Sequence, residues 1–186
     1  MKKINLLLLF ITLSVVTIAQ QQSSPIRQGA VLVYSVYPEG GELQSELIFE
    51  RISADTVVIA WTTFGRTVRN GRRTMVGSSL KTSKTGYWEP PFDGEDILLP
   101  ADQSMLLMSK EVYAQAKNNG RVQFDGLQFI SSTSLYDMGG VKLPAIELKS
   151  ENGRASIWIL DDPSLPLMLK YSGNPYYVDL EILGVK

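Results

Sequence analysis

The stretch AIELKSENGRASIWIL, residues 145–160, decides the fold class of this chain. Its centre, Asn152-Gly153, suits a two-residue type I′ turn, because both central residues of that turn need a positive φ. Such a turn places Leu148 opposite Ile157, and the next alternate pair along the two arms is again apolar. One face is therefore apolar and the other mainly polar, which is typical of two antiparallel strands packed on a core.

A second segment, VQFDGLQF at residues 122–129, repeats this pattern around Asp125-Gly126. A two-residue turn there brings four apolar side chains to one face of a hairpin: Val122, Phe124, Leu127 and Phe129. Turn chemistry and hydrophobic alternation agree in both segments. Such agreement between local signals indicates that the chain folds mainly as antiparallel β-strands.

The rest of the chain contains further strand-like runs, rich in β-branched and aromatic residues and bounded by turn-forming residues. These runs are residues 30–37, 42–52, 56–64, 79–88, 167–172 and 176–183. A hairpin centred on Asn70-Gly71 is predicted within residues 66–77, and its simple register places Arg69 opposite Arg72. Residues 89–100 hold three prolines and a glycine, which predicts a surface loop.

One helix is predicted, over about residues 101–118. Apolar residues recur there at intervals of three and four, the repeat of one helix face: Ala101, Met105, Met108, Val112 and Ala116. One apolar helix stripe needs one apolar sheet face. The predicted fold is therefore α+β and mostly β, a curved antiparallel half-barrel of about nine or ten strands packed around one amphipathic helix. Residues 30–186 form a single domain in this interpretation, with residues 20–29 as a lead-in.

The N-terminus predicts export from the cytoplasm. Lys2 and Lys3 precede an apolar run, and a small-residue cleavage site ends at Ala19, so residues 1–19 match a secretory signal peptide. A membrane anchor is the alternative, but the run is shorter than the roughly 20 residues that a span needs. No cysteine follows the site to accept a lipid, so we expect no stable membrane anchor after cleavage and a periplasmic or secreted protein.

The composition excludes several classes of function. The net charge is close to zero, which gives no indication of a nucleic-acid partner. The chain has no histidine and no cysteine, so a Ser-His-Asp triad and the usual zinc or copper sites are excluded. The acidic cluster of Asp93, Glu95 and Asp96 lacks the spacing of a calcium-binding loop and is interpreted as a solvated loop. No metal and no cofactor are expected.

Ser78-x-x-Lys81 and Lys84-Thr85-Gly86 are similar to two signatures of serine β-lactamases and penicillin-binding proteins. That chemistry needs the serine at a helix start with the lysine one turn later. The segment is predicted to be extended, so residues 78 and 81 point to opposite faces. No Ser-Asp-Asn follows, and we expect no catalytic residue and no enzyme.

Two groups of side chains are candidates for binding. Four aromatic residues are predicted to line a pocket for an apolar ligand: Trp61, Phe64, Tyr87 and Trp88. Packing in the core, or stacking on sugars, is the alternative for these rings. Arg69 and Arg72 are candidates for binding an anion such as a lipid headgroup, with a solvated ribbon as the alternative.

The predicted architecture resembles the half-barrel of the LolA/LolB-like periplasmic lipoprotein carriers and related exported β-rich domains. The resemblance rests on the signal peptide, the β-meander, the internal helix and the late segment Trp158-Ile159-Leu160-Asp161-Asp162-Pro163. It implies a concave face that holds acyl chains. The expected function is non-enzymatic binding of an apolar or amphiphilic ligand, such as a lipid, or of an envelope protein partner. A carbohydrate-binding or surface-adhesion module is the alternative, and a carboxylate-based hydrolase a third.

Overall fold

The computed structural model describes residues 26–39, 41–118 and 120–186, and the predicted signal peptide lies outside them. Strands dominate these residues, and the helical segments are the short α1 (Gly77–Thr82) and α2 (Lys110–Asn118). The strands before α2 are β1 (Val31–Pro38), β2 (Leu43–Ile52), β3 (Thr56–Phe64), β4 (Val68–Val76), β5 (Thr85–Gly86), β6 (Glu95–Leu98) and β7 (Gln103–Ser104). Those after it are β8 (Arg121–Phe124), β9 (Leu127–Met138), β10 (Val141–Ser150), β11 (Ser156–Leu160), β12 (Met168–Ser172) and β13 (Val178–Val185).

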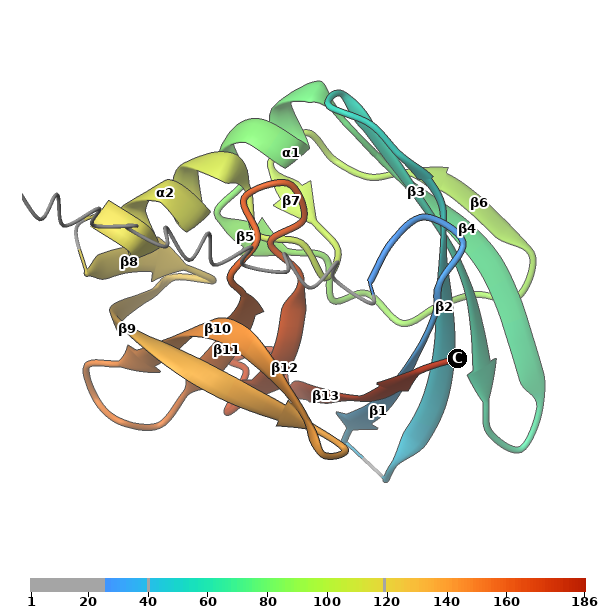
Figure 1. Cartoon of the computed structure of the whole chain (residues 1–186). Helices are drawn as coiled ribbons and strands as arrows, with labels where there is room; N and C mark the ends of the chain where they lie inside the picture. The colour runs from blue at the N-terminus through green and yellow to red at the C-terminus, as the bar shows by residue number, and fades with distance from the viewer. Residues whose placement is uncertain (1–25, 40, 119) are drawn as a thin grey trace, which may run out of the picture.

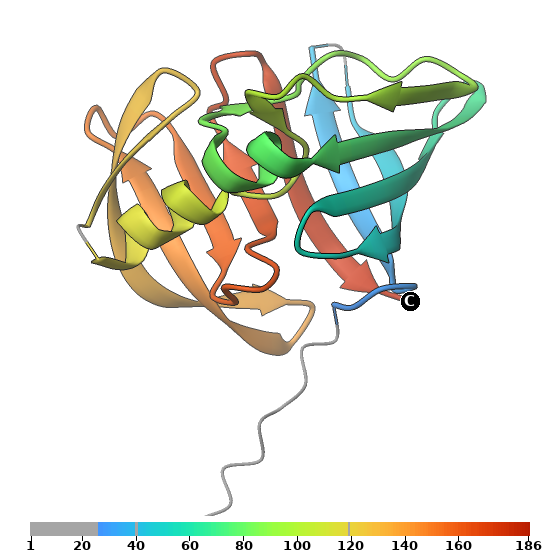
Figure 2. The ribbon, with the colours of Figure 1, turned by 90° about the horizontal axis from the view of Figure 1, so that it is seen from above.

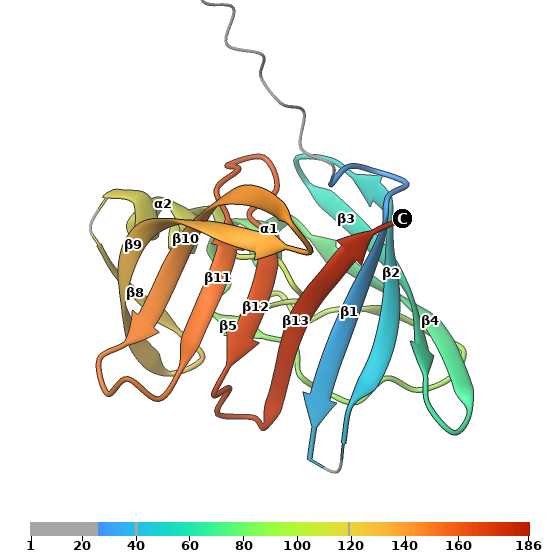
Figure 3. The same cartoon turned by 60° about the horizontal axis from the view of Figure 1, so that its bottom comes forward.

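Eleven strands form one curved sheet, in the order β6-β4-β3-β2-β1-β13-β12-β11-β10-β9-β8. Figure 3 shows these strands side by side, with the last strand next to the first in the middle of the sheet. The sheet is not a closed barrel, and the helices lie on its inner face (Figure 1). The predicted fold class, a mostly β protein with a curved sheet around a helix, is confirmed. One pair, β4 with β6, is parallel, so the sheet is mixed rather than purely antiparallel.

Both hairpins that decided the fold class are confirmed. Leu148 pairs with Ile157 across β10 and β11, and Lys149 with Ser156, as the predicted register requires. The connection is not the predicted type I′ turn, because Gly153 has a positive φ and Asn152 does not. Val122 pairs with Phe129 across β8 and β9. The four side chains are almost completely buried, so the apolar face identified from the alternation is the face that packs on the core.

The hairpin predicted around Asn70-Gly71 is wrong. The turn between β3 and β4 lies at residues 65–67, and Asn70-Gly71 is inside β4. Arg69 consequently pairs with Thr63, not with Arg72, which lies opposite Ala60. The glycine serves packing instead of a turn, because a Cβ at Gly71 would lie 2.8 Å from Cζ2 of Trp61 on the neighbouring strand.

The extended segment predicted at residues 79–88 is also wrong in its first half. Residues 77–82 form α1, and only Thr85–Gly86 is a strand. Gly77 has a φ of 41°, which glycine adopts readily, and its N–H donates to Asp55 O at 3.0 Å where β4 ends. The helix then buries Ser79 and Leu80 against the core, which a solvent-facing polar strand would not do. The predicted loop 89–100 contains the short strand β6.

Only the second half of the predicted helix 101–118 is helical. The segment before α2 pairs instead with the late loop: Leu107 forms a bridge with Leu167. Met108 N–H donates to Pro166 O at 3.0 Å, and Met168 N–H donates to Leu106 O at 2.7 Å. Leu106 has a φ of 60°, so the chain leaves helical geometry there. These long-range hydrogen bonds pair backbone N–H and C=O groups that would be paired within the helix if α2 began earlier.

The helices cover one half of the inner face only. Helix α2 packs on β8, β9 and β10, and α1 joins it to the end of β4, as Figure 2 shows from above. The half built from β1 to β4 and β13 is covered by the non-helical segment between α1 and α2. No helix in the described part of the chain is long and apolar enough to cross a membrane.

Candidate pocket on the inner face of the sheet

A pocket of about 350 Å³ lies between the inner face of β1 to β4 and β13 and the segment that follows α1. Its floor comes mainly from the sheet: Tyr34, Val36, Leu43, Leu47, Trp61 and Leu180. Its cover comes from the proline-rich loop and the segment before α2: Tyr87, Trp88, Glu89, Pro90, Pro91, Met105 and Leu106. Ligand sites in proteins are typically cavities of roughly 300–1,000 Å³ with mostly apolar walls and few polar groups, and this pocket has that character.

The structure brings three of the four predicted aromatic residues together. Trp61 lies on the floor of the pocket, and Tyr87 and Trp88 lie on its cover. Phe64 is not among the lining residues and is 39% exposed. Alternate residues of a strand point to opposite faces, and Thr63 points inward, so Phe64 points out.

The ring of Trp61 occupies the space left by a glycine in the neighbouring strand. Trp61 is 4% exposed and lies opposite Gly71 of β4, where any side chain would collide with the ring. Its Nε1 has no hydrogen-bond partner among the described residues. A buried N–H without an acceptor is costly, and this one is enclosed by its neighbours and does not open on the pocket.

Trp88 is fixed by the turn of a distant hairpin. Asp125, at a φ of 49° in the β8–β9 turn, accepts from Trp88 Nε1 at 3.0 Å and from Gly86 N–H at 2.8 Å. The indole also packs edge-on against Tyr171, with 5.6 Å between ring centroids. Burial is the main cause that raises the pKa of Asp125 to about 6, against the two hydrogen bonds, which lower it. The turn predicted from Asp125-Gly126 thus has a second role that the local sequence did not indicate.

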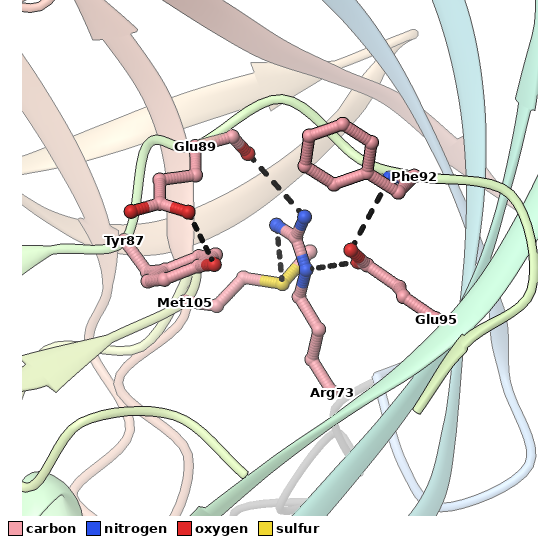
Figure 4. A network of polar contacts seen from close by, with 6 residues as sticks. All are labelled: Arg73, Tyr87, Glu89, Phe92, Glu95 and Met105. Atoms are coloured by element: carbon pink, nitrogen blue, oxygen red, sulfur yellow. Dashed lines mark hydrogen bonds and ion pairs between the residues drawn. The ribbon is translucent and has the colours of Figure 1, made fainter. Parts of the chain in front are cut away.

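A buried ion pair of Arg73 and Glu95 lies beside the pocket, and Figure 4 shows the polar contacts around it. Arg73 Nε donates to Glu95 Oε1 at 2.5 Å, and the two side chains are only 5% and 7% exposed. The guanidinium lies 4.8 Å from the ring centroid of Tyr87 and 5.8 Å from that of Trp61. Its other nitrogens reach Glu89 O at 3.3 Å and the sulfur of Met105 at 3.9 Å. Arg73 therefore joins the floor of the pocket to its cover.

The Arg73–Glu95 pair was not predicted from the sequence. Both residues stood in segments interpreted as solvated, an arginine-rich hairpin and an acidic loop, and no local signal joins them. The pairing depends on the parallel register of β4 and β6, in which Arg73 lies opposite Ile97 and Gly71 opposite Glu95. Burial of two charges is tolerated only when they are paired and hydrogen-bonded, which is the case here.

The two predicted anion-binding arginines lie on opposite faces of β4. Arg72 is on the outer face, where it donates to Glu50 at 2.7 Å and to Asp96 at 3.2 Å. The hydrogen bond and charge of Glu50 raise the pKa of its guanidinium. Arg69 lines the mouth of the pocket and has no ion pair among the described residues. Arg72 is therefore already neutralised by acids, whereas Arg69 is not.

The Ser78-x-x-Lys81 pattern lies outside the pocket. Because α1 is helical, the two side chains are one turn apart, and the argument from an extended segment was wrong. Both residues are exposed, however, and Lys81 forms an ion pair with Asp55 at 3.3 Å. In the described part of the chain no three acidic side chains are grouped so that they could hold a metal ion.

No protein-family model, curated protein or solved structure matches this chain. The resemblance to the LolA/LolB-like group therefore stays a prediction, and function is argued below from the pocket alone.

Proposed function

We propose that this protein is an exported, non-enzymatic protein of the cell envelope whose pocket binds an apolar or amphiphilic ligand. The observation that carries the proposal is the pocket itself, an apolar cavity on the half of the sheet that the helices leave uncovered. A folded chain normally fills such a space with its own side chains. Here the Arg73–Glu95 pair and the hydrogen-bonded Trp88 fix the distance between the cover and the sheet, so the space stays open.

The geometry favours this proposal over a carbohydrate-binding module. Sugars are usually bound on flat, exposed rings, whereas Trp61 is 4% exposed and Trp88 is partly buried. Two indoles on facing walls of a cavity suit an alkyl chain or another compact apolar group. A partner protein could supply such a group as an inserted side chain or as a lipid attached to the partner.

Native mass spectrometry of the full protein, expressed with its leader and purified without detergent, tests the proposal. We expect a population whose mass exceeds that of the mature chain by one apolar molecule, released on denaturation. A fluorescence titration with dodecanoate of the stripped protein gives a second readout, because two of the three tryptophans line the pocket.

Trp158 provides the control for that titration. It lies outside the pocket and packs against Tyr136, with 5.6 Å between ring centroids. We expect W158F to keep the full fluorescence response and W88F to lose much of it. If there is neither additional mass nor any response of Trp61 and Trp88, the proposed function is wrong.

A further inference from the structure

Three polar side chains from neighbouring strands form a row across the floor of the pocket. Ser45 of β2 lies opposite Thr63 of β3, and Thr63 lies opposite Arg69 of β4. All three line the pocket. The adjacent row is apolar, with Leu47 opposite Trp61. A polar row beside an apolar one is the arrangement that a molecule with a polar head and an apolar tail requires.

The row presents hydrogen-bond donors. Ser45 Oγ and Thr63 Oγ1 are 3.0 Å apart, so one hydroxyl donates to the other. The accepting hydroxyl keeps its own hydrogen, for which the described residues provide no acceptor, although the two residues are only 7% and 9% exposed. Buried donors of this kind are satisfied when an acceptor enters the site.

The charge beside the row is positive. Arg69 and Arg66 both line the pocket, and neither has an ion pair in the part of the chain that the structure describes. The other two arginines of this strand are neutralised, Arg72 by Glu50 and Asp96 and Arg73 by Glu95. The one acid that lines the pocket, Glu89, lies on the cover, where its carboxylate accepts from Tyr87. The floor therefore offers one hydroxyl and two guanidinium groups to a negatively charged group.

We propose that the pocket selects a single-chain amphiphile with an anionic head, a carboxylate or a phosphate, held by Arg69 and by the Ser45–Thr63 hydroxyl pair. Its tail lies along Leu47 and Trp61 and under Met105. This inference rests on the proposed function and adds the class of the head group. Charge-assisted hydrogen bonds to a guanidinium are about twice as strong as neutral ones, so the head contributes selectivity that the apolar walls alone cannot give.

Calorimetric titration of the stripped full-length mature protein with four probes of equal chain length tests the inference. The probes are dodecanoate, dodecyl phosphate, 1-dodecanol and dodecyltrimethylammonium, each below the concentration at which it aggregates. We expect one or both anions to bind about tenfold or more tightly than the alcohol, and the cation most weakly. The two anionic probes distinguish a carboxylate head from a phosphate head.

Variants at the row and on the opposite face provide matched tests. R69Q and T63V should reduce the preference for the anion over the alcohol to within about threefold, while binding of 1-dodecanol persists. R72Q removes a charge from the same strand but from its outer face, and should leave the preference unchanged. Circular dichroism of each variant checks that the fold is retained.

Two results overturn the inference and leave the proposed function intact: 1-dodecanol binds as tightly as both anions, or R69Q keeps the full preference. If none of the four probes binds, the proposed function fails together with the inference. If R72Q lowers the preference as much as R69Q does, the effect comes from general charge, and the head does not bind at the row.

Discussion

Gly71 lies directly opposite Trp61, and the absence of a side chain at Gly71 makes room for the indole that forms the floor of the pocket. The space at Gly71 is closed on a second side by β6. A Cβ there would meet the backbone oxygen and Cγ of Glu95 at 2.7 Å and Trp61 Cζ2 at 2.8 Å. One glycine therefore determines both the position of a ring in the pocket and the approach of the edge strand.

We expect G71A to destabilise the protein by about 1–3 kcal/mol, because a backbone atom is among the groups that must move. The variant should also weaken ligand binding, since Trp61 or β6 must shift. Urea unfolding and the fluorescence titration measure the two effects. The control is G184A in β13, where no atom lies within 4 Å of the new Cβ, and its stability should change by less than about 1 kcal/mol. If G71A has the same free energy of unfolding and the same ligand affinity as the original protein, the close approach at Gly71 has no consequence for packing.

The Arg73–Glu95 pair predicts strong coupling between two substitutions. R73M leaves the carboxylate of Glu95 buried without its cation, and E95Q leaves the guanidinium without its anion, so each should cost about 3–5 kcal/mol. The double variant removes both charges and should be more stable than the sum of the single effects indicates. A double-mutant cycle by urea unfolding measures this coupling.

The exposed pair of Arg72 and Glu50 is the comparison for that cycle. Its side chains are 46% and 38% exposed, so R72Q and E50Q should couple by less than about 1 kcal/mol. Added salt should weaken this outer pair and leave the coupling of Arg73 and Glu95 almost unchanged, because buried charges are poorly screened. Equal coupling in both cycles would contradict the distinction.

The raised pKa of Asp125 predicts an unusual dependence of stability on pH. Burial raises the pKa of this carboxyl to about 6 in the folded protein. Between about pH 4 and pH 6 the folded protein therefore holds a proton that the unfolded chain has already lost, and the contribution of Asp125 to stability falls as the pH rises through this window. The decrease is about 3 kcal/mol.

D125N tests this sign. Asparagine tolerates the positive φ of 49° at this position and keeps one acceptor for Gly86 N–H. The free energy of unfolding of the original protein, minus that of D125N, should decrease from pH 4 to pH 7. A difference that stays constant would mean that the carboxyl titrates at its ordinary pKa, and one that increases with pH would mean that its pKa is lowered, so either result contradicts the prediction.

We expect Ser78 and Lys81 not to react with a penicillin. Both are exposed on α1, outside the pocket, and Lys81 pairs with Asp55. A fluorescent penicillin should leave no covalent adduct on the protein, and S78A should alter neither stability by more than about 0.5 kcal/mol nor ligand binding. A serine adduct that S78A abolishes would overturn the expectation of a non-enzymatic protein.

The strands could be predicted where local turn chemistry and long alternation agreed. Asn152-Gly153 and Asp125-Gly126 both gave hairpins with the correct register, but only Asp125-Gly126 has the positive φ at both central residues that the type I′ turn requires. Asn70-Gly71 carried the same local signal and was misleading. Its glycine is required by the ring of Trp61 in the neighbouring strand, and packing of that kind has no local signature.

The helix shows a second limit of sequence reasoning. Met105, Met108 and Val112 fit a helical repeat, yet only Val112 is in α2, because the chain around Leu107 pairs with the loop at Leu167. The pocket, too, could be predicted only in part. Three aromatic residues of the candidate site line it, but the buried ion pair and the donor row arise from pairing between strands, and no single segment of the sequence indicates them.

The open sheet has two outermost strands, β6 and β8, and each is only four residues long. Unpaired strand edges are templates on which another chain can add and start aggregation, and short or charged edges suppress this. At one end Glu95 and Asp96 occupy β6, with their charges matched by Arg73 and Arg72 of β4. At the other end α2 packs over β8. The two edges of this open sheet thus offer a second copy of the chain little to extend.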